Sequence, residues 1–121
     1  MKTTLTSLTF IAALAATPAL ADYRPITDQA EFLALLETKS LSNRLYGLTL
    51  DVSPDGTITG RAAGYDVSGT WAWEDGYFCR QMDWGGTDIP YNCQLVEIRN
   101  GNEMRFTVDQ GAGDSASFKL R

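Results

Sequence analysis

Charged side chains that are able to do acid–base chemistry are spread through the middle of the 121-residue chain. Arg61, Glu74, Arg80, Asp83 and Asp88 could meet near one rim of a folded domain, and paired carboxylates beside an arginine can carry general acid–base catalysis. The chain is acidic, however, with 15 Asp and Glu against 10 Lys and Arg. In such a domain these side chains more often form a solvated face with ion pairs, so we predict no catalytic residue among them.

The absence of histidine limits the chemistry further. It excludes a histidine-based metal site, a Ser-His-Asp triad and imidazole acid–base catalysis. The formal net charge of −5 argues against a nucleic-acid partner, because nucleic acids bind to basic surfaces. The glycine-rich stretch 111–115 lacks the lysine and the helix that follow in a phosphate-binding loop. We therefore expect a turn there and no cofactor.

Residues 51–56, Asp-Val-Ser-Pro-Asp-Gly, match the first half of an EF-hand calcium loop. The twelfth position of such a loop supplies a bidentate Glu, whereas Ala62 stands at that position here. Proline followed by Asp-Gly is typical of a tight turn between two strands. The sequence therefore predicts a hairpin at this place and no metal site.

Aromatic side chains are concentrated between positions 71 and 91. Trp71 and Trp73 fall on one face of a predicted strand, which assigns them to the core. Trp84 and Tyr91 flank a segment that contains Gly85 and Gly86, and exposed rings on a braced loop are a common way to build a binding site. The predicted ligand-binding residues are Arg80, Asp83, Trp84 and Tyr91.

Residues 1–21 have the three parts of a secretory signal peptide in the right order. Lys2 gives a positive start, residues 8–16 are almost entirely apolar but too short to span a bilayer, and Ala19-Leu20-Ala21 is a typical cleavage site. We therefore expect residues 22–121 to form a single β-rich domain that is periplasmic or secreted. No membrane association is expected after cleavage.

Cys79 and Cys93 are the only two cysteines, and both lie in the predicted exported part. An even number of cysteines in a small exported domain predicts a disulfide, and two cysteines in a monomer leave one possible pairing. A redox role would require a C-x-x-C motif and a helix N-terminus, and neither is visible. We predict a structural bridge, which contributes about 3 kcal/mol in the chain-entropy description.

Hydrophobic periodicity predicts one helix followed by strands. Residues 28–38 place Phe32 and Leu36 on one helical face, and Thr27 or Asp28 can cap the N-terminus. Apolar residues alternate in the rest of the chain, with turn signals such as Asn-Gly between the runs. The predicted strands cover residues 45–52, 57–63, 67–73, 77–82, 93–99, 103–108 and 115–120, with an irregular segment at 83–92.

About seven short strands joined by tight turns favour an antiparallel meander, curled into a barrel-like or strongly bent sheet. In this mainly β fold the helix covers one open end or face. The disulfide joins neighbouring strands across the irregular segment 83–92. A two-sheet sandwich is the alternative architecture.

Residues 69–80, Gly-Thr-Trp-Ala-Trp-Glu-Asp-Gly-Tyr-Phe-Cys-Arg, followed by Tyr-Asn-Cys at 91–93, resemble a motif of small exported alphaproteobacterial proteins of unknown function. These share a helix, an Asp-Gly-Thr turn (residues 55–57 here), a W-x-W-x-x-G-x-x-C-R run and a second cysteine. The resemblance covers most of residues 22–121. Some such proteins carry the name dihydrodipicolinate reductase, an enzyme with a dinucleotide-binding domain, whose G-x-G-x-x-G fingerprint is missing here.

The sequence leaves three functions open. The first is a non-enzymatic binding module for a small apolar or sugar-like ligand, which an internal cavity lined by Trp71, Phe106 and Leu48 would favour. The second is an interaction module for a periplasmic protein, such as an inhibitor of a secreted enzyme, which a solid core with projecting Trp84 and Tyr91 would favour. The third and least favoured is an enzyme, which would need carboxylates that converge in a cleft.

Overall fold

The structure is a computed structural model that describes residue 4 and residues 22–121. The predicted signal peptide, apart from Thr4, lies outside the described residues. Nine strands and one helix occur in residues 22–121, with two short 3-10 turns at Arg44–Tyr46 and Asp109–Gly111. The elements are β1 (Arg24–Ile26), α1 (Gln29–Leu36), β2 (Leu41–Asn43), β3 (Leu48–Val52), β4 (Thr57–Ala62), β5 (Tyr65–Glu74), β6 (Tyr77–Trp84), β7 (Thr87–Arg99), β8 (Glu103–Thr107) and β9 (Ser115–Leu120).

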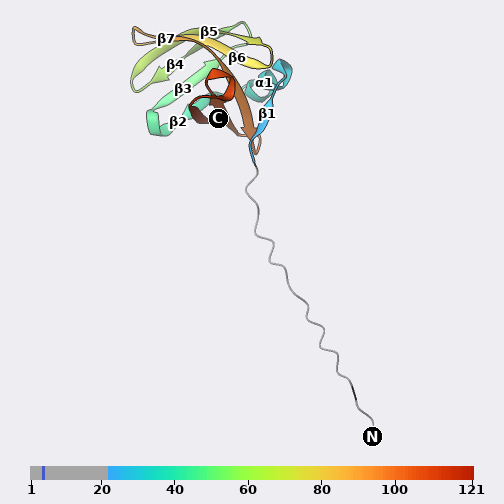
Figure 1. Cartoon of the computed structure of the whole chain (residues 1–121). Helices are drawn as coiled ribbons and strands as arrows, with labels where there is room; N and C mark the ends of the chain where they lie inside the picture. Colours follow the sequence, from blue (N-terminus) through green and yellow to red (C-terminus); the bar gives the residue numbers. More distant parts are fainter. Residues whose placement is uncertain (1–3, 5–21) are drawn as a thin grey trace.

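Eight of the strands close into an antiparallel barrel (Figure 1). Going round the barrel the order is β7-β6-β5-β4-β3-β2-β9-β8, and β8 pairs again with β7. The remaining strand, β1, adds to β7 at residues 96–98, beyond the part of β7 that pairs with β6. The predicted mainly β fold, with a helix near the N-terminus and an antiparallel barrel, is confirmed.

Side chains alternate between the inside and the outside of the barrel, as the period of two predicts. On β4, Ile58 and Ala62 are buried while Thr59 and Arg61 are exposed. Gly60 also faces inward, and a Cβ added there would collide with the Thr49 carbonyl. Glycine therefore lets two neighbouring strands approach closely, which helps a strongly bent sheet to close.

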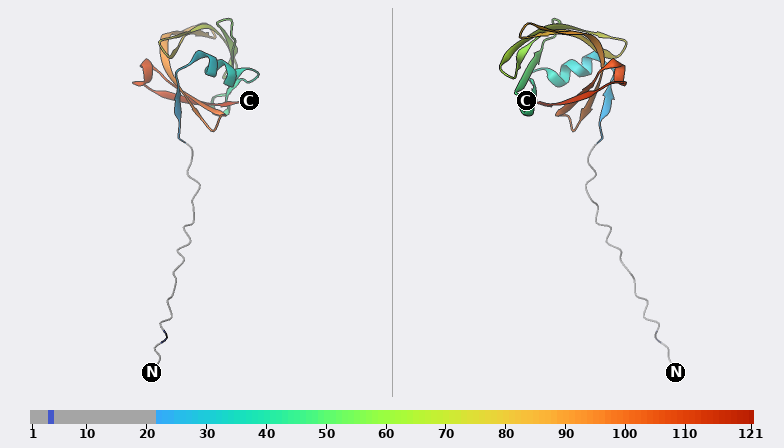
Figure 2. Two further views of the ribbon diagram at one scale, coloured as in Figure 1. Left: turned by 90° about the vertical axis from the view of Figure 1, so that its right-hand side faces the viewer. Right: turned by 60° about the vertical axis from the view of Figure 1, so that its left-hand side comes forward.

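Helix α1 covers one end of the barrel, where Figure 2 shows it lying across the ring of strands. It begins after Asp28, whose side chain accepts a hydrogen bond from the Ala30 N–H at 3.0 Å. That satisfies one of the free N–H groups of the first turn. Phe32 and Leu36 are buried, as predicted, but the helix ends at Leu36 and is shorter than the predicted range 28–38.

The prediction of an irregular segment at residues 83–92 was wrong. β6 continues to Trp84 and β7 begins at Thr87, with Gly85 and Gly86 as the two turn residues. Both glycines have positive φ angles, 55° and 92°, which a two-residue hairpin turn requires. Pro90 is accommodated because the register between β6 and β7 shifts next to it, and such a bulge tolerates a missing N–H.

Two short strands, β1 and β2, were not predicted, because a strand of three residues is too short to show an alternation of apolar and polar residues. The predicted strand 45–52 begins only at Leu48, since Arg44–Tyr46 forms a 3-10 turn. The predicted hairpin at 51–56 is present, and it uses Asp55. Its carboxylate accepts hydrogen bonds from the Thr57 hydroxyl and N–H at 2.6 and 3.0 Å, which lower the pKa of Asp55.

Within the described part of the chain, no helix is long and apolar enough to cross a bilayer.

Candidate functional site

The barrel contains an internal cavity of about 340 Å³. It lies in the middle of the barrel, above the side chains that pack against α1. Most of its walls are apolar side chains that point inward from seven of the eight barrel strands, all except β5, so the interior is not a fully packed core. The main apolar lining residues are Leu50, Ile58, Met82, Ile89, Phe106 and Phe118.

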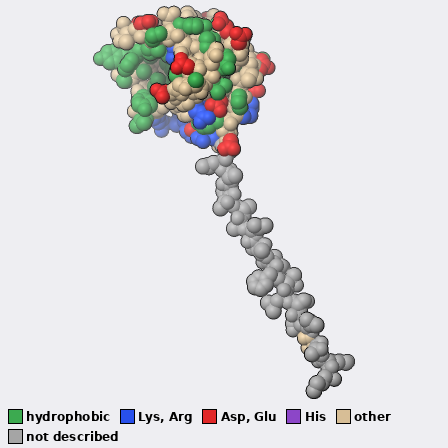
Figure 3. All heavy atoms as spheres, in the orientation of Figure 1, with side chains coloured by type: hydrophobic (Ala, Val, Ile, Leu, Met, Phe, Trp, Pro, Cys, Tyr) green, Lys and Arg blue, Asp and Glu red, His purple; other side chains and the backbone are tan. Residues whose placement is uncertain are grey.

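A second hollow of about 650 Å³ forms the mouth at the end opposite α1. It shares Leu50, Met82 and Ile89 with the internal cavity, so the two spaces are adjacent. Hydrophobic side chains gather on this side of the molecule in Figure 3. Among them, Leu45 is 84% and Tyr46 is 64% exposed, and neighbouring large side chains that are exposed together form an apolar patch.

The opposite end of the barrel is closed by aromatic packing. The ring of Phe32, which is fully buried, lies 5.0 to 5.6 Å from the rings of Trp71, Trp73 and Phe78. Phe106 lies 5.4 Å from Phe78 and continues the cluster toward the cavity. Such ring pairs add to the burial of apolar area, so this end is a filled core.

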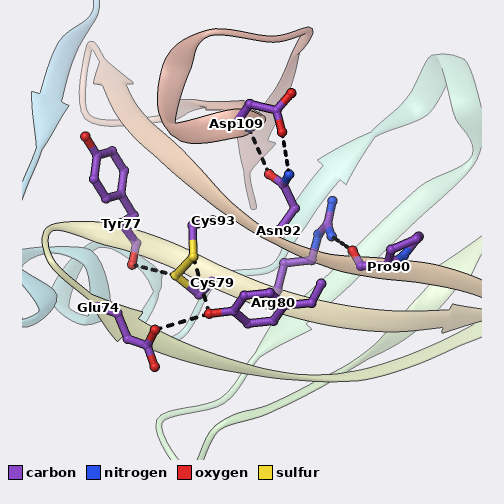
Figure 4. The surroundings of a disulfide bond; sticks show 9 residues. Glu74, Tyr77, Cys79, Arg80, Pro90, Asn92, Cys93 and Asp109 are labelled. Atoms are coloured by element: carbon purple, nitrogen blue, oxygen red, sulfur yellow. Dashed lines mark hydrogen bonds between the residues drawn. A yellow bond between two sulfur atoms is a disulfide. The ribbon is translucent and has the colours of Figure 1, made fainter.

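Arg80 is the predicted binding residue that the structure places inside the barrel. Its side chain points inward from β6 and lines the cavity, and the residue is only 8% exposed. Nη1 donates a hydrogen bond to the Pro90 carbonyl at 2.7 Å (Figure 4). This carbonyl is available because the bulge beside Pro90 interrupts the pairing of β6 with β7. Burial lowers the pKa of Arg80 from its ordinary value.

Few other polar groups face the cavity. Gln94 on β7 is buried and lines it at the level of Phe78, its partner on β6, two residues from the pair formed by Arg80 and Asn92. Asp114 and Ser115 line its outer edge and are exposed. Arg80 forms no ion pair with Asp114 or with any other carboxylate in the described part of the chain. The cavity therefore combines an apolar wall with one unpaired guanidinium.

Trp84, also predicted to bind ligand, lies at the mouth. It pairs with Val67 across β5 and β6, so its ring is on the inner face of the barrel rim and is 38% exposed. Its indole N–H donates to the Ala62 carbonyl at 2.9 Å. The ring also makes an edge contact with Tyr65, at a centroid distance of 6.2 Å. These contacts hold the ring in place while one side of it faces the opening.

Tyr91 and Asp83 are the two predicted binding residues that line neither the cavity nor the mouth. Asp83 accepts a hydrogen bond from the Gly86 N–H at 3.0 Å and braces the β6–β7 turn. The Tyr91 hydroxyl donates to Glu74 at 3.1 Å, and the Cys93 sulfur is 3.3 Å from it. The pKa of Tyr91 is raised, mainly by partial desolvation and to a smaller extent by the neighbouring Glu74 carboxylate.

The predicted disulfide between Cys79 and Cys93 is present, and it joins directly opposite residues of β6 and β7 (Figure 4). Glu74 lies close enough to both sulfurs to complete a group of three potential metal ligands. Both cysteines are oxidised in the bridge, however, and metals bind thiolates. This group therefore stabilises the barrel wall and offers no metal centre.

The charged residues considered for catalysis do not converge. Arg61 pairs with Asp66 on the outer wall at 3.0 Å, and Glu74 is engaged by Tyr91. Asp83 and Asp88 pair across β6 and β7 on the outside, whereas Arg80 points inside. Within the described residues, no cleft brings two of these carboxylates together with an arginine.

The cavity itself was only partly foreseeable. Phe106 lines the interior and Leu48 lines the mouth, as expected for a binding barrel, whereas Trp71 packs in the closed end. Gln94 and Ile89 were missed because they fall in or next to the segment predicted to be irregular. Alternation alone gives the inward face of a strand, but it does not distinguish a filled core from a cavity.

No known protein family matches this chain, and no curated protein or solved structure is significantly similar to it. The function is therefore inferred from the geometry of the barrel.

Proposed function

We propose that this protein is an exported, periplasmic or secreted binding module that holds a small, largely apolar ligand inside its barrel. The internal cavity of about 340 Å³ carries this proposal. Protein interiors are normally close-packed and keep few voids larger than a water molecule, and ligand pockets begin at about 300 Å³. An unfilled apolar space of this size costs stability, which a ligand that fills it restores.

The chemistry of the walls favours an apolar ligand over a sugar-like one. A sugar needs many hydrogen-bonding partners, whereas Arg80, Gln94 and Ser115 are among the few polar side chains at the cavity. The mouth adds the apolar side chains of Leu48 and Val67 and the ring of Trp84. We therefore assign Trp84 and Arg80 to ligand contact, Trp84 at the mouth and Arg80 inside, and we assign the ligand to the apolar class.

A specific observation also favours the interaction module as a second candidate. The side chains of Leu45 and Tyr46 project from the 3-10 turn beside the mouth, and exposed apolar groups that gather in one place mark interaction sites. In this alternative a periplasmic protein covers the mouth and the cavity stays without a small molecule.

Two measurements test the proposal. Native mass spectrometry of protein purified gently from a periplasmic extract reports any small molecule that leaves on denaturation. A fluorescence titration with the neutral probe N-phenyl-1-naphthylamine then compares the wild type with Ala116→Leu, which adds side-chain volume at the exposed edge of the cavity, opposite Phe106. Thr59→Leu is the matched control, because residue 59 is exposed on the outside of β4.

We expect the probe to bind the wild type and Thr59→Leu equally, and to bind Ala116→Leu about tenfold more weakly. Equal binding to all three proteins would place the probe outside the cavity. If no small molecule is found and the probe does not bind, the proposal fails and the interaction module is the function to pursue.

A further inference from the structure

Arg80 is the one feature of the cavity that a purely apolar ligand does not explain. It is 8% exposed, and it lies between Phe78 and Met82 on the inner face of β6. Arginine is rarely buried without a partner, because removing its charge from water is costly. The other interior positions of β6 are apolar or aromatic, so a leucine or methionine here would continue the core.

The guanidinium keeps donors free for a ligand. It carries five N–H donors, and the structure gives it one hydrogen bond, from Nη1 to the Pro90 carbonyl. No side-chain nitrogen or oxygen in the described residues is both sealed from solvent and without a partner. The remaining nitrogens of Arg80 are therefore accessible, and the cavity that Arg80 lines is the space they reach.

No carboxylate of the described residues neutralises this charge. The four ion pairs in residues 22–121 use Arg24, Arg61, Arg99 and Arg105, and all four lie away from the cavity. Asp114 lies at the exposed edge of the cavity and does not pair with Arg80. Arg80 is thus a positive group inside an apolar space, with room beside it for an anion.

We propose that the ligand is a monocarboxylate with an apolar tail, such as a fatty acid, and that Arg80 binds its carboxylate. This inference rests on the binding function proposed above. The planar guanidinium fits a carboxylate with two parallel hydrogen bonds, and the Gln94 amide, on the same cavity wall, has two further donors. One buried positive charge balances one negative charge, so a dianion would leave an uncompensated charge inside the barrel.

The position of Arg80 also orients the ligand. The end below it is filled by the aromatic cluster around Phe32, whereas the apolar walls above it continue into the mouth. The carboxylate therefore lies deep in the barrel, and the tail runs past Met82 and Ile89 toward Trp84. This arrangement withdraws the acidic group from water and leaves the far end of the tail at the opening.

A competition experiment on the full-length exported protein tests this inference. Each of three ligands, dodecanoate, methyl dodecanoate and 1-dodecanol, is titrated against protein that carries bound N-phenyl-1-naphthylamine, and its affinity is obtained from the loss of probe fluorescence. The proteins compared are the wild type, Arg80→Met, Arg80→Lys and Arg61→Met. Arg61→Met is the matched control, because it removes an exposed arginine from the outer wall. Far-ultraviolet circular dichroism confirms that each variant is folded.

We expect the wild type and Arg61→Met to bind dodecanoate at least about tenfold more tightly than the alcohol and the ester, as a charge-assisted hydrogen bond in a buried site implies. Arg80→Met should lose this preference and keep its affinity for the alcohol, while Arg80→Lys should retain part of the preference. The comparison of three ligands on the wild type needs no variant, so it decides the question even if Arg80→Met does not fold.

Two results overturn the inference. One is equal affinity of the wild type for dodecanoate and 1-dodecanol, and the other is an unchanged carboxylate preference in Arg80→Met. In either case binding of the neutral probe would still support an apolar cavity. Failure of the probe and of all three ligands to bind would instead remove the proposed function itself, so the two failures are distinguishable.

Discussion

The two ends of the barrel use the same strands for opposite purposes. On β6, Phe78 packs under α1 in a largely buried aromatic cluster, whereas Trp84 stands at an open rim six residues later on the same face. Arg80 lies between them and marks the level at which packing gives way to the cavity. Packing that stabilises the fold is therefore concentrated at the end closed by the helix, which leaves the other end free to keep an unfilled space.

The largest effect on stability should follow from removing the ring of Phe32 at the closed end of the barrel. Phe32→Ala deletes a fully buried ring that contacts four other aromatic rings, so we expect a loss of about 3–5 kcal/mol in the free energy of unfolding. Urea denaturation followed by circular dichroism measures it. Leu45→Ala at the mouth is the control and should change stability by less than about 0.5 kcal/mol. Similar losses from both variants would contradict the contrast between the ends.

Removing the disulfide should have the next largest effect. Cys79→Ala combined with Cys93→Ala opens the covalent link between β6 and β7, and we expect a loss of about 2–3 kcal/mol. Differential scanning calorimetry of the variant and of reduced wild type should show the same lowered melting temperature. Unchanged melting in both samples would show that the bridge does not stabilise the barrel.

The replacement of Arg80 should separate stability from ligand binding. Without a ligand, Arg80→Met removes a buried charge that has no acidic partner in the described residues, so we expect the free energy of unfolding to rise by about 1 kcal/mol. Urea denaturation in the absence of fatty acid measures this. A loss of more than about 1 kcal/mol would mean that Arg80 supports the fold through its bond to Pro90.

The smallest effect concerns Tyr91 and appears only at alkaline pH. The folded protein holds the pKa of Tyr91 above the ordinary value of 10.0, so folding favours the protonated hydroxyl. Its contribution is complete below pH 10 and is lost as the pH rises through the folded pKa. Tyr91→Phe should remove this slope from a plot of melting temperature against pH. A slope of the same size in the variant would assign it to another group.

The sequence predicts the barrel well because its signals are local. Alternation places Leu50 on the inner face of β3, and Asn-Gly marks the turn between β7 and β8. The β6–β7 hairpin was missed because Gly85-Gly86 and Pro90 were interpreted as a break, although one makes a tight turn and the other lies at a bulge.

The candidate site could be predicted only in part. Arg80 lines the cavity and Trp84 lines the mouth, whereas Asp83 faces outward because it is adjacent to Trp84 on the same strand. Whether inward side chains fill the space between them depends on how strands from distant parts of the chain pack together. No local pattern contains that information.

The three tryptophans report most directly whether a ligand binds at the open end of the barrel. Trp71 and Trp73 donate their indole N–H groups at the closed end, to Ser53 and Thr27, whereas Trp84 donates to Ala62 at the mouth. We would titrate isotope-labelled protein with N-phenyl-1-naphthylamine and follow the indole N–H signals by NMR spectroscopy. If the probe occupies the cavity and the mouth, the Trp84 signal shifts while those of Trp71 and Trp73 stay almost unchanged. Shifts confined to Trp71 and Trp73, or binding without any shift of Trp84, would contradict it.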